Sequence, residues 1–139
     1  MGKETAAEFI ERKTRQWKRD REQGRAIKTK DVGRQGHHLW LRECWTWQVQ
    51  HNLPQKVIVL ERWRYLRTVG ARANRGGAKP GDIEYRIGYW TIAHTGRARG
   101  RWWWGQYSPL IPHVDLGALL KKAKNEKTLL TRVSRGRSR

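Results

Sequence analysis

Two carboxylates stand two residues apart where an alternating segment of the chain begins. In the stretch GDIEYR, Asp82 and Glu84 are followed by the cation Arg86. On a β-strand both carboxylates would point to the same face, and such a pair can hold Mg²⁺ for phosphodiester hydrolysis. Nothing else in the chain completes a nuclease signature. A small metal-dependent nuclease is therefore an alternative hypothesis, and an outward-facing ion pair at the start of a strand accounts for the same residues.

The histidines and the single cysteine give weaker signals. The spacings between His37, His38, Cys44 and His51 match no standard zinc finger. Cys44 lies within a strand pattern, where it fits a small packed residue. The sequence holds no nucleophile–histidine arrangement, phosphate-binding loop or dinucleotide fingerprint. We therefore expect no metal and no cofactor, and we favour a protein that is not an enzyme.

Charge is the strongest compositional feature of the chain. Its 139 residues include 31 Lys and Arg against 12 Asp and Glu, which gives a formal net charge of +19. Self-repulsion of this size destabilises a compact monomer. A nucleic acid relieves it, because each neutralised phosphate also releases condensed counterions. A basic protein of membrane surfaces would need a helix with a strong apolar face, for which the sequence offers only a weak candidate. The expected partner is therefore a nucleic acid, DNA or RNA, and not a membrane.

Three consecutive tryptophans follow an arginine-glycine run in the stretch RGRWWWGQY, residues 99–107. On a strand, Trp102 and Trp104 share one side and Trp103 takes the other, so the three rings cannot all enter one core. Rings left on a sheet surface can stack nucleic-acid bases, and neighbouring arginines can bind phosphates. Among the nine tryptophans of the chain, we expect most in the core and at least one or two on the surface, with Trp102 and Trp104 as the candidates.

Other cations gather in two predicted loops and one predicted helix. The stretches GARANRGGAKPG and HTGRARGR combine glycine, which lets the backbone approach a phosphate, with arginine, which can bind it through two parallel hydrogen bonds. A solvated basic surface is the competing interpretation for each segment. The candidate phosphate-binding residues are Lys18, Arg19, Arg21, Arg72, Arg75, Lys79, Arg97, Arg99 and Arg101.

The N-terminal part of the chain shows one helical and one alternating pattern. Residues 3–24 carry apolar side chains at helical spacing, with acidic residues early and basic residues late, as the helix dipole favours. Residues 25–38 lack periodicity and predict a basic linker. Residues 39–50 alternate as a strand with one buried face, on which Glu43 interrupts the pattern. Leu39, Leu41, Trp45, Trp47 and Val49 share one parity, and Trp40 takes the other.

The second half of the chain predicts more strands and a final helix. Residues 56–69 begin with a β-branched run that favours a long strand, although a helix over their second half stays open. Residues 83–92 and 101–107 predict a β-hairpin whose cationic tip is the stretch HTGRARG. Residues 112–124 have helical spacing, and residues 128–133 are expected to add an edge strand.

Together these elements predict an α+β fold. We expect a small, mainly antiparallel curved sheet or partly open barrel of three to five strands, with an N-terminal and a C-terminal helix packed on it. Residues 1–38 would form a basic helix and linker, residues 39–133 a single domain, and residues 134–139 a disordered basic tail.

The favoured function is non-enzymatic binding of nucleic acid, through Lys and Arg contacts to phosphates and through surface aromatics. A further alternative is a tryptophan-rich protein-interaction module in a phage, mobile-element or ribonucleoprotein assembly. One cysteine fits a reducing compartment, and the start of the chain lacks the apolar core of a secretion signal. We expect a cytoplasmic protein associated with the nucleoid or with ribonucleoprotein.

Overall fold

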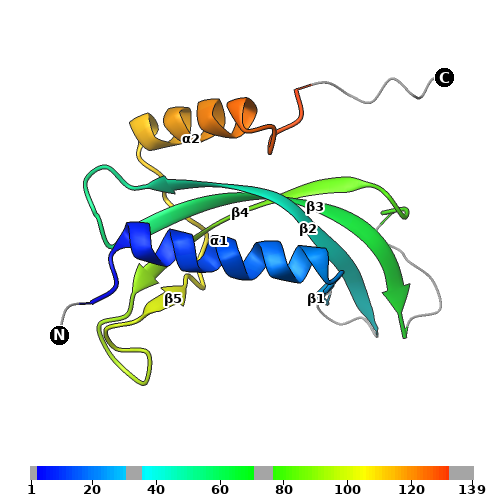
Figure 1. The fold of residues 1–139 in the computed structure, drawn as a ribbon, viewed down its shortest axis with the longest axis horizontal. Coiled ribbons are helices and arrows are strands. Elements are labelled where there is room, and N and C mark those ends of the chain that lie inside the picture. The colour runs from blue at the N-terminus through cyan, green and yellow to red at the C-terminus, as the bar shows by residue number, and fades with distance from the viewer. Residues whose placement is uncertain (1–2, 31–35, 71–76, 132–139) are drawn as a thin grey trace.

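The computed structural model describes residues 3–30, 36–70 and 77–131 and confirms the α+β architecture (Figure 1). The sheet is a curled half-barrel of five antiparallel strands in the order β1-β2-β3-β4-β5. Two helices flank it. The elements are α1 (Ala6–Glu22), β1 (Ile27–Thr29), β2 (His37–Val49), β3 (Lys56–Val69), β4 (Ile83–Ile92), β5 (Trp102–Trp104) and α2 (His113–Asn125).

The two helices lie on opposite faces of the sheet, and each buries its own core. We name the faces after them. On the α1 face, Phe9 and Trp17 pack among Trp47, Val57 and Val59. On the α2 face, the buried apolar side chains of α2, Leu119 and Ala123, pack against Ile58 and Leu60 of β3. Both faces are therefore covered in the middle of the sheet, at β2 and β3.

Helix α1 has a well-defined start. Thr5 and Glu8 form a reciprocal capping box: the Thr5 amide donates to the Glu8 carboxylate at 2.9 Å, and the Glu8 amide donates to the Thr5 hydroxyl at 3.1 Å. The helix ends before Gly24, whose positive φ of 67° favours glycine. Because Phe9 is fully buried, α1 is part of the domain and not a separate basic arm.

Two predicted segments differ from the observed ones. The stretch 25–38 is not only a linker, because Ile27–Thr29 form β1 and Ile27 pairs with Trp40. A strand of three residues is too short to show an alternating pattern in the sequence. The predicted edge strand at 128–133 is wrong for its described part: residues 128–131 join no strand. Thr128 is instead buried through its side chain, with its hydroxyl 2.8 Å from that of Thr46. The predicted tail, 134–139, lies outside the described residues.

Strand β3 settles the open choice for residues 56–69, which form one strand and no helix. Its side chains alternate between the two covered faces, and this explains the unbroken run Val57–Leu60. In β2 the alternation is broken by a β-bulge at Glu43, since Arg42 pairs with Trp63 and Cys44 with Arg62. The bulge brings Trp40 to the α1 face, where it packs with Trp63 and Tyr65. The predicted opposition of Trp40 to Trp47 is therefore wrong.

A buried carboxylate fastens α2 to the turn after β2. Asp115, in the first turn of α2, is 1 % exposed and accepts hydrogen bonds from the His51 backbone amide at 3.1 Å and from Gln48 at 3.3 Å. Its Oδ2 lies 2.7 Å from Nδ1 of His51. Burial by itself raises the pKa of Asp115, but these hydrogen bonds outweigh it and hold the pKa below its ordinary value.

We expect Asp115→Asn to lower the free energy of unfolding by about 2 kcal/mol near neutral pH, because hydrogen bonds to charged groups contribute roughly 1.5–3 kcal/mol. The folded-state pKa lies below the unfolded one, so the stabilisation is complete above about pH 4 and is lost as the pH falls through the folded-state pKa. Urea unfolding at about pH 6 and about pH 3 measures this. An equal difference between the two proteins at both pH values would contradict the assignment.

Candidate nucleic-acid interface

The loop between β4 and β5 is closed by hydrogen bonds of its own backbone. The Gly100 amide donates to the Ala93 carbonyl at 2.8 Å, the Arg99 amide to Gly96 at 3.2 Å, and the Arg101 amide to Ala98 at 2.8 Å. Gly96 and Gly100 have φ of 76° and 81°, a region that favours glycine. The predicted hairpin with a cationic tip is therefore present, and its tip is closed by backbone hydrogen bonds.

Three arginines project from this loop. Arg97, Arg99 and Arg101 are exposed. The Arg101 guanidinium donates to the Arg97 carbonyl at 2.7 Å, which fixes its direction. No carboxylate among the described residues pairs with any of the three, and their charge is left for a partner.

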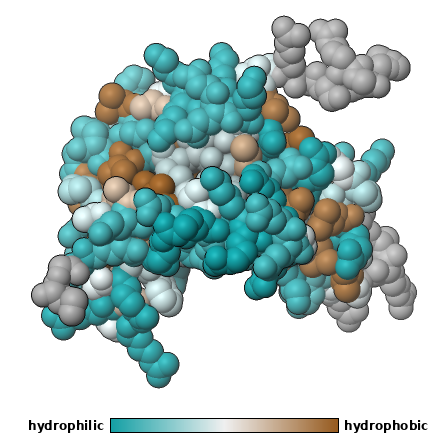
Figure 2. Space-filling model, in the orientation of Figure 1, coloured by the Kyte–Doolittle hydropathy of each residue, from teal (hydrophilic) through white to brown (hydrophobic). Residues whose placement is uncertain are grey.

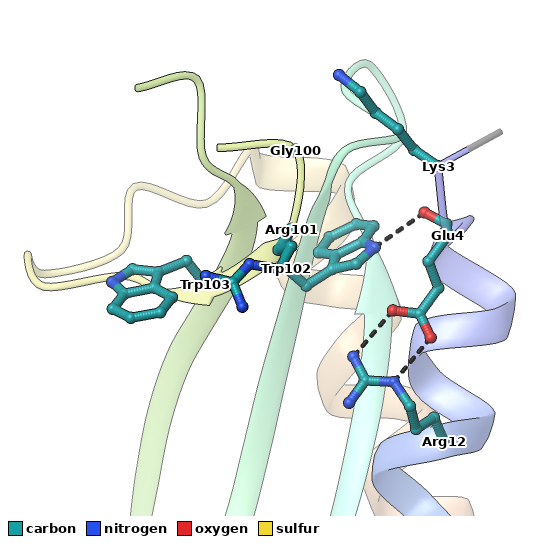
Figure 3. Close-up of a pocket in the computed structure, with 7 residues that line it drawn as sticks. All are labelled: Lys3, Glu4, Arg12, Gly100, Arg101, Trp102 and Trp103. Atoms are coloured by element: carbon teal, nitrogen blue, oxygen red, sulfur yellow. Dashed lines mark hydrogen bonds and ion pairs between the residues drawn. The ribbon is translucent and has the colours of Figure 1, made fainter. Parts of the chain in front are cut away.

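An open pocket of about 610 Å³ lies between this loop and the start of α1 (Figure 3). Lys3 and Arg101 bring positive charge to it, and Trp103 lies at its edge. Glu4 also lines the pocket, but its carboxylate accepts two hydrogen bonds of 2.8 Å from Arg12. That hydrogen bonding is the main reason why the pKa of Glu4 is lowered and that of Arg12 is raised. Glu4 and Arg12 therefore neutralise one another, and the pocket keeps the charge of Lys3 and Arg101.

The triple tryptophan divides between the faces as its alternation predicts. Trp102 and Trp104 point to the α1 face, because they pair with Ile92 and Trp90, and Trp103 points to the other face. Trp102 stacks on Phe9 with ring centroids 4.8 Å apart, and its indole donates to the Glu4 carbonyl at 3.0 Å. Its ring is only 6 % exposed. The expectation that Trp102 offers a stacking surface is thus wrong, because the ring completes the core under α1.

Trp104 is half-buried and already has partners. The Arg86 guanidinium lies 4.4 Å from its ring centroid, and Trp90 meets it edge to face at 5.3 Å. Gly88 makes room for it, since a Cβ there would lie 2.2 Å from the Trp104 ring. The exposed ring of the three is Trp103, at 49 %, which the sequence did not single out.

More tryptophan rings lie in the core than the composition led us to expect. Of the nine rings, all in the described residues, Trp103 is the one in the exposed class. Five rings are buried and three are half-buried; the buried ones are Trp17, Trp40, Trp47, Trp63 and Trp102, and the half-buried ones are Trp45, Trp90 and Trp104. Surface aromatics therefore contribute one tryptophan ring to this candidate site.

Two arginines that look like surface cations in the sequence bind a buried carboxylate. Arg42 and Arg86 converge on Glu61, which is fully buried on the α1 face. Arg42 Nε lies 2.6 Å from Glu61, and Arg86 Nη2 lies 2.9 Å from it. Arg42 also lies 3.9 Å from the Trp17 ring centroid. Burial lowers the pKa of Arg42, an effect that the charge of Glu61 opposes. This cluster joins β2, β3 and β4.

The remaining predicted cations lie away from the arginine loop. Lys18 and Arg19 are exposed near the end of α1, about 20 Å along the helix from Lys3. Arg21 donates to the Glu43 carbonyl at 2.9 Å, and so ties α1 to β2. Lys79 is exposed in the turn before β4, about 30 Å along that strand from the loop. Arg72 and Arg75 lie outside the described residues. The two basic loops therefore flank opposite ends of β4.

The nuclease and zinc hypotheses gain no support. Asp82 lies in a turn, where its carboxylate accepts a hydrogen bond from the Lys79 amide at 2.8 Å, and Glu84 is exposed on β4. Within the described ranges, no group of three or more His, Cys, Asp or Glu side chains is placed to hold a metal ion. The helices of the described part are also too short or too polar to cross a membrane.

Comparison with known proteins gives no match: no family model, no curated protein and no solved structure is similar to the chain. The function is therefore inferred from the surface of the structure. The space-filling view shows hydrophilic side chains over much of the face that carries α1 (Figure 2).

Proposed function

We propose that this protein binds nucleic acid without catalysis, through contacts of the arginine loop (residues 94–101) and Lys3 to phosphates. The observation that carries the proposal is the hydrogen-bonded loop with three exposed arginines, none of which pairs with a carboxylate of the described residues. Of the other charged side chains that line the pocket, Arg12 already pairs with Glu4. A phosphate backbone supplies the missing negative charge, and arginine can bind it with parallel hydrogen bonds.

The exposed ring of Trp103 is a suitable surface for a base. Arg101 directly precedes β5, two residues before Trp103, and both residues line the pocket beside the arginine loop. A single base stacked on an aromatic ring contributes roughly 1–3 kcal/mol by alanine substitution. A ring beside an arginine favours an unpaired base, and so a single strand or a nucleic-acid end. The proposal includes the location of the protein, which is with the nucleoid or with ribonucleoprotein.

The test is fluorescence anisotropy with labelled single-stranded and duplex DNA and RNA, over a series of salt concentrations. Changing Arg97, Arg99 and Arg101 together to alanine is expected to weaken binding. It should flatten the slope of log K against log[salt] by about 2 to 3, since each phosphate contact contributes roughly 0.7 to 0.9. Trp103→Ala should weaken binding to single strands more than to duplexes.

A matched control removes the same charge elsewhere. Arg67, Lys121 and Lys124 are exposed on β3 and α2, away from the arginine loop. Their triple alanine variant should change the salt slope by less than half as much. If both triple variants flatten the slope equally, binding depends on net charge alone and the arginine loop is not the site. Probes shortened only in the presence of Mg²⁺ would favour the nuclease instead.

A further inference from the structure

One edge of the sheet is open along half of β4. β5 pairs with Trp90, Thr91 and Ile92 alone, and the Gly105 amide extends the contact to the Tyr89 carbonyl at 2.8 Å. From Ile83 to Gly88, no strand of the described chain lies on that side (Figure 1). At the opposite edge of the sheet the outer strand, β1, is only three residues long. Among the described residues, the outer side of β2 also lacks a strand partner from Leu41 to Val49, but α1 contacts it there through Arg21, which donates to the Glu43 carbonyl.

The direction of the free backbone groups follows from the pairing. In an antiparallel ladder, alternate residues direct both N–H and C=O to the same neighbour. The Tyr89 carbonyl points outward to Gly105, whereas the Asp82 carbonyl accepts from Tyr65 on β3. Odd-numbered residues of β4 therefore face outward, and even-numbered ones face β3. The outward groups without a strand partner in the described chain belong to Ile83, Tyr85 and Ile87.

Apolar side chains accompany this edge on the α2 face. Tyr85 and Ile87 are 39 % and 37 % exposed. The Leu130 amide donates to the Tyr85 hydroxyl at 3.0 Å, so the end of the described chain lies beside Tyr85. Other exposed apolar side chains on α2 and in the segment that follows it are Leu116, Leu120 and Leu130. Soluble proteins usually protect a long edge of this kind, because it is a template for another strand.

We propose that the open edge of β4 pairs with the same edge of a second copy of this chain, in an antiparallel register centred on Tyr85. The sequence Ile83-Glu84-Tyr85-Arg86-Ile87 is complementary to itself in that register. Ile83 lies opposite the partner's Ile87, and Tyr85 opposite the partner's Tyr85. Glu84 lies opposite the partner's Arg86, twice across the two-fold axis.

The charges at this edge select a second copy as the occupant. Like charges opposite one another destabilise strand pairing, and opposite charges stabilise it. Glu84 is exposed and has no ion-pair partner among the described residues. Arg86 uses Nε and Nη2 on Glu61, which leaves Nη1 for a second carboxylate. Both side chains lie on the α1 face, while the apolar ones lie on the α2 face, so the dimer would match charge on one face and apolar surface on the other.

The first test is sedimentation equilibrium of the full chain, freed of nucleic acid, at physiological and at about 1 M salt, where the Debye length is about 3 Å and the repulsion between two basic copies is screened. We expect a dimer. Glu84→Arg places arginine opposite arginine and should weaken dimerisation at least tenfold at physiological salt. Glu22→Arg makes the same charge change at an exposed site on α1 and should leave dimerisation unchanged. A monomer at all concentrations overturns the proposal.

The second test fixes the register. In a Cys44→Ser background, which removes the single native cysteine, Tyr85→Cys should be linked to its copy by a short thiol cross-linker. The two Cα atoms of such a pair lie about 5.5 Å apart. Ile83→Cys should not be linked, because the two copies of residue 83 lie about 13 Å apart in this register. Equal cross-linking at both positions, or at neither, overturns the register centred on Tyr85. Neither test involves nucleic acid, so its result is independent of the proposed function.

Discussion

Glu61→Ala is expected to lower the free energy of unfolding by about 3–5 kcal/mol, the range for removing one partner from a buried ion pair. The carboxylate is fully buried between β2 and β4. It accepts from Arg42 at 2.6 Å, from Arg86 at 2.9 Å and from the Trp63 indole at 2.9 Å. Without it, two guanidinium groups stay close together at a partly desolvated site, and the indole N–H loses its acceptor.

Urea unfolding of the full chain measures this change. Glu22→Ala removes an exposed carboxylate from α1 and should alter stability by no more than about 0.5 kcal/mol. Glu61→Gln keeps the shape and one acceptor oxygen, so its loss should fall between the two. A loss below about 1 kcal/mol for Glu61→Ala would show that water reaches the arginines and that the site is not desolvated.

The fold was predictable where one pattern decided each element. Periodic spacing predicted α1 and α2, and alternation predicted β4. In β2, Glu43 interrupted the buried parity in the sequence, and the structure shows why: it is the extra residue of a β-bulge. Its carboxylate lies on the α2 face, in ion pairs with Arg62 and Arg64. The interruption was visible, but its effect on Trp40 depends on pairing with β3, which no local pattern contains.

The candidate site was predictable in its chemistry and not in its geometry. The arginines of residues 94–101 are an unusual local cluster, and alternation placed Trp103 opposite its two neighbours. Which side of β5 is covered depends on α1, more than 80 residues earlier, through the stacking of Phe9 on Trp102. The proximity of Lys3 to Gly100 has the same origin. Long-range contacts of this kind leave no signal in a single sequence.

Phe9→Ala is the second change with a large expected effect, a loss of about 3–5 kcal/mol of unfolding free energy. Phe9 is fully buried. Its ring lies 4.8 Å from Trp102, 5.3 Å from Trp90 and 5.8 Å from Trp47. Aromatic pairs of this geometry contribute roughly 0.5–1.5 kcal/mol beyond the area that they bury. Alanine would therefore leave a cavity between α1 and three tryptophans from β2, β4 and β5.

The same substitution also tests how α1 positions the arginine loop. Trp102 leads directly from Arg101 into the core, and its indole is bonded to the Glu4 carbonyl at 3.0 Å. Loosening Trp102 should therefore weaken nucleic-acid binding even at temperatures where the variant remains folded by circular dichroism. Phe9→Leu fills most of the volume and should cost less than about 1.5 kcal/mol. Full binding by a folded Phe9→Ala protein would mean that the loop is positioned by its own hydrogen bonds, without help from α1.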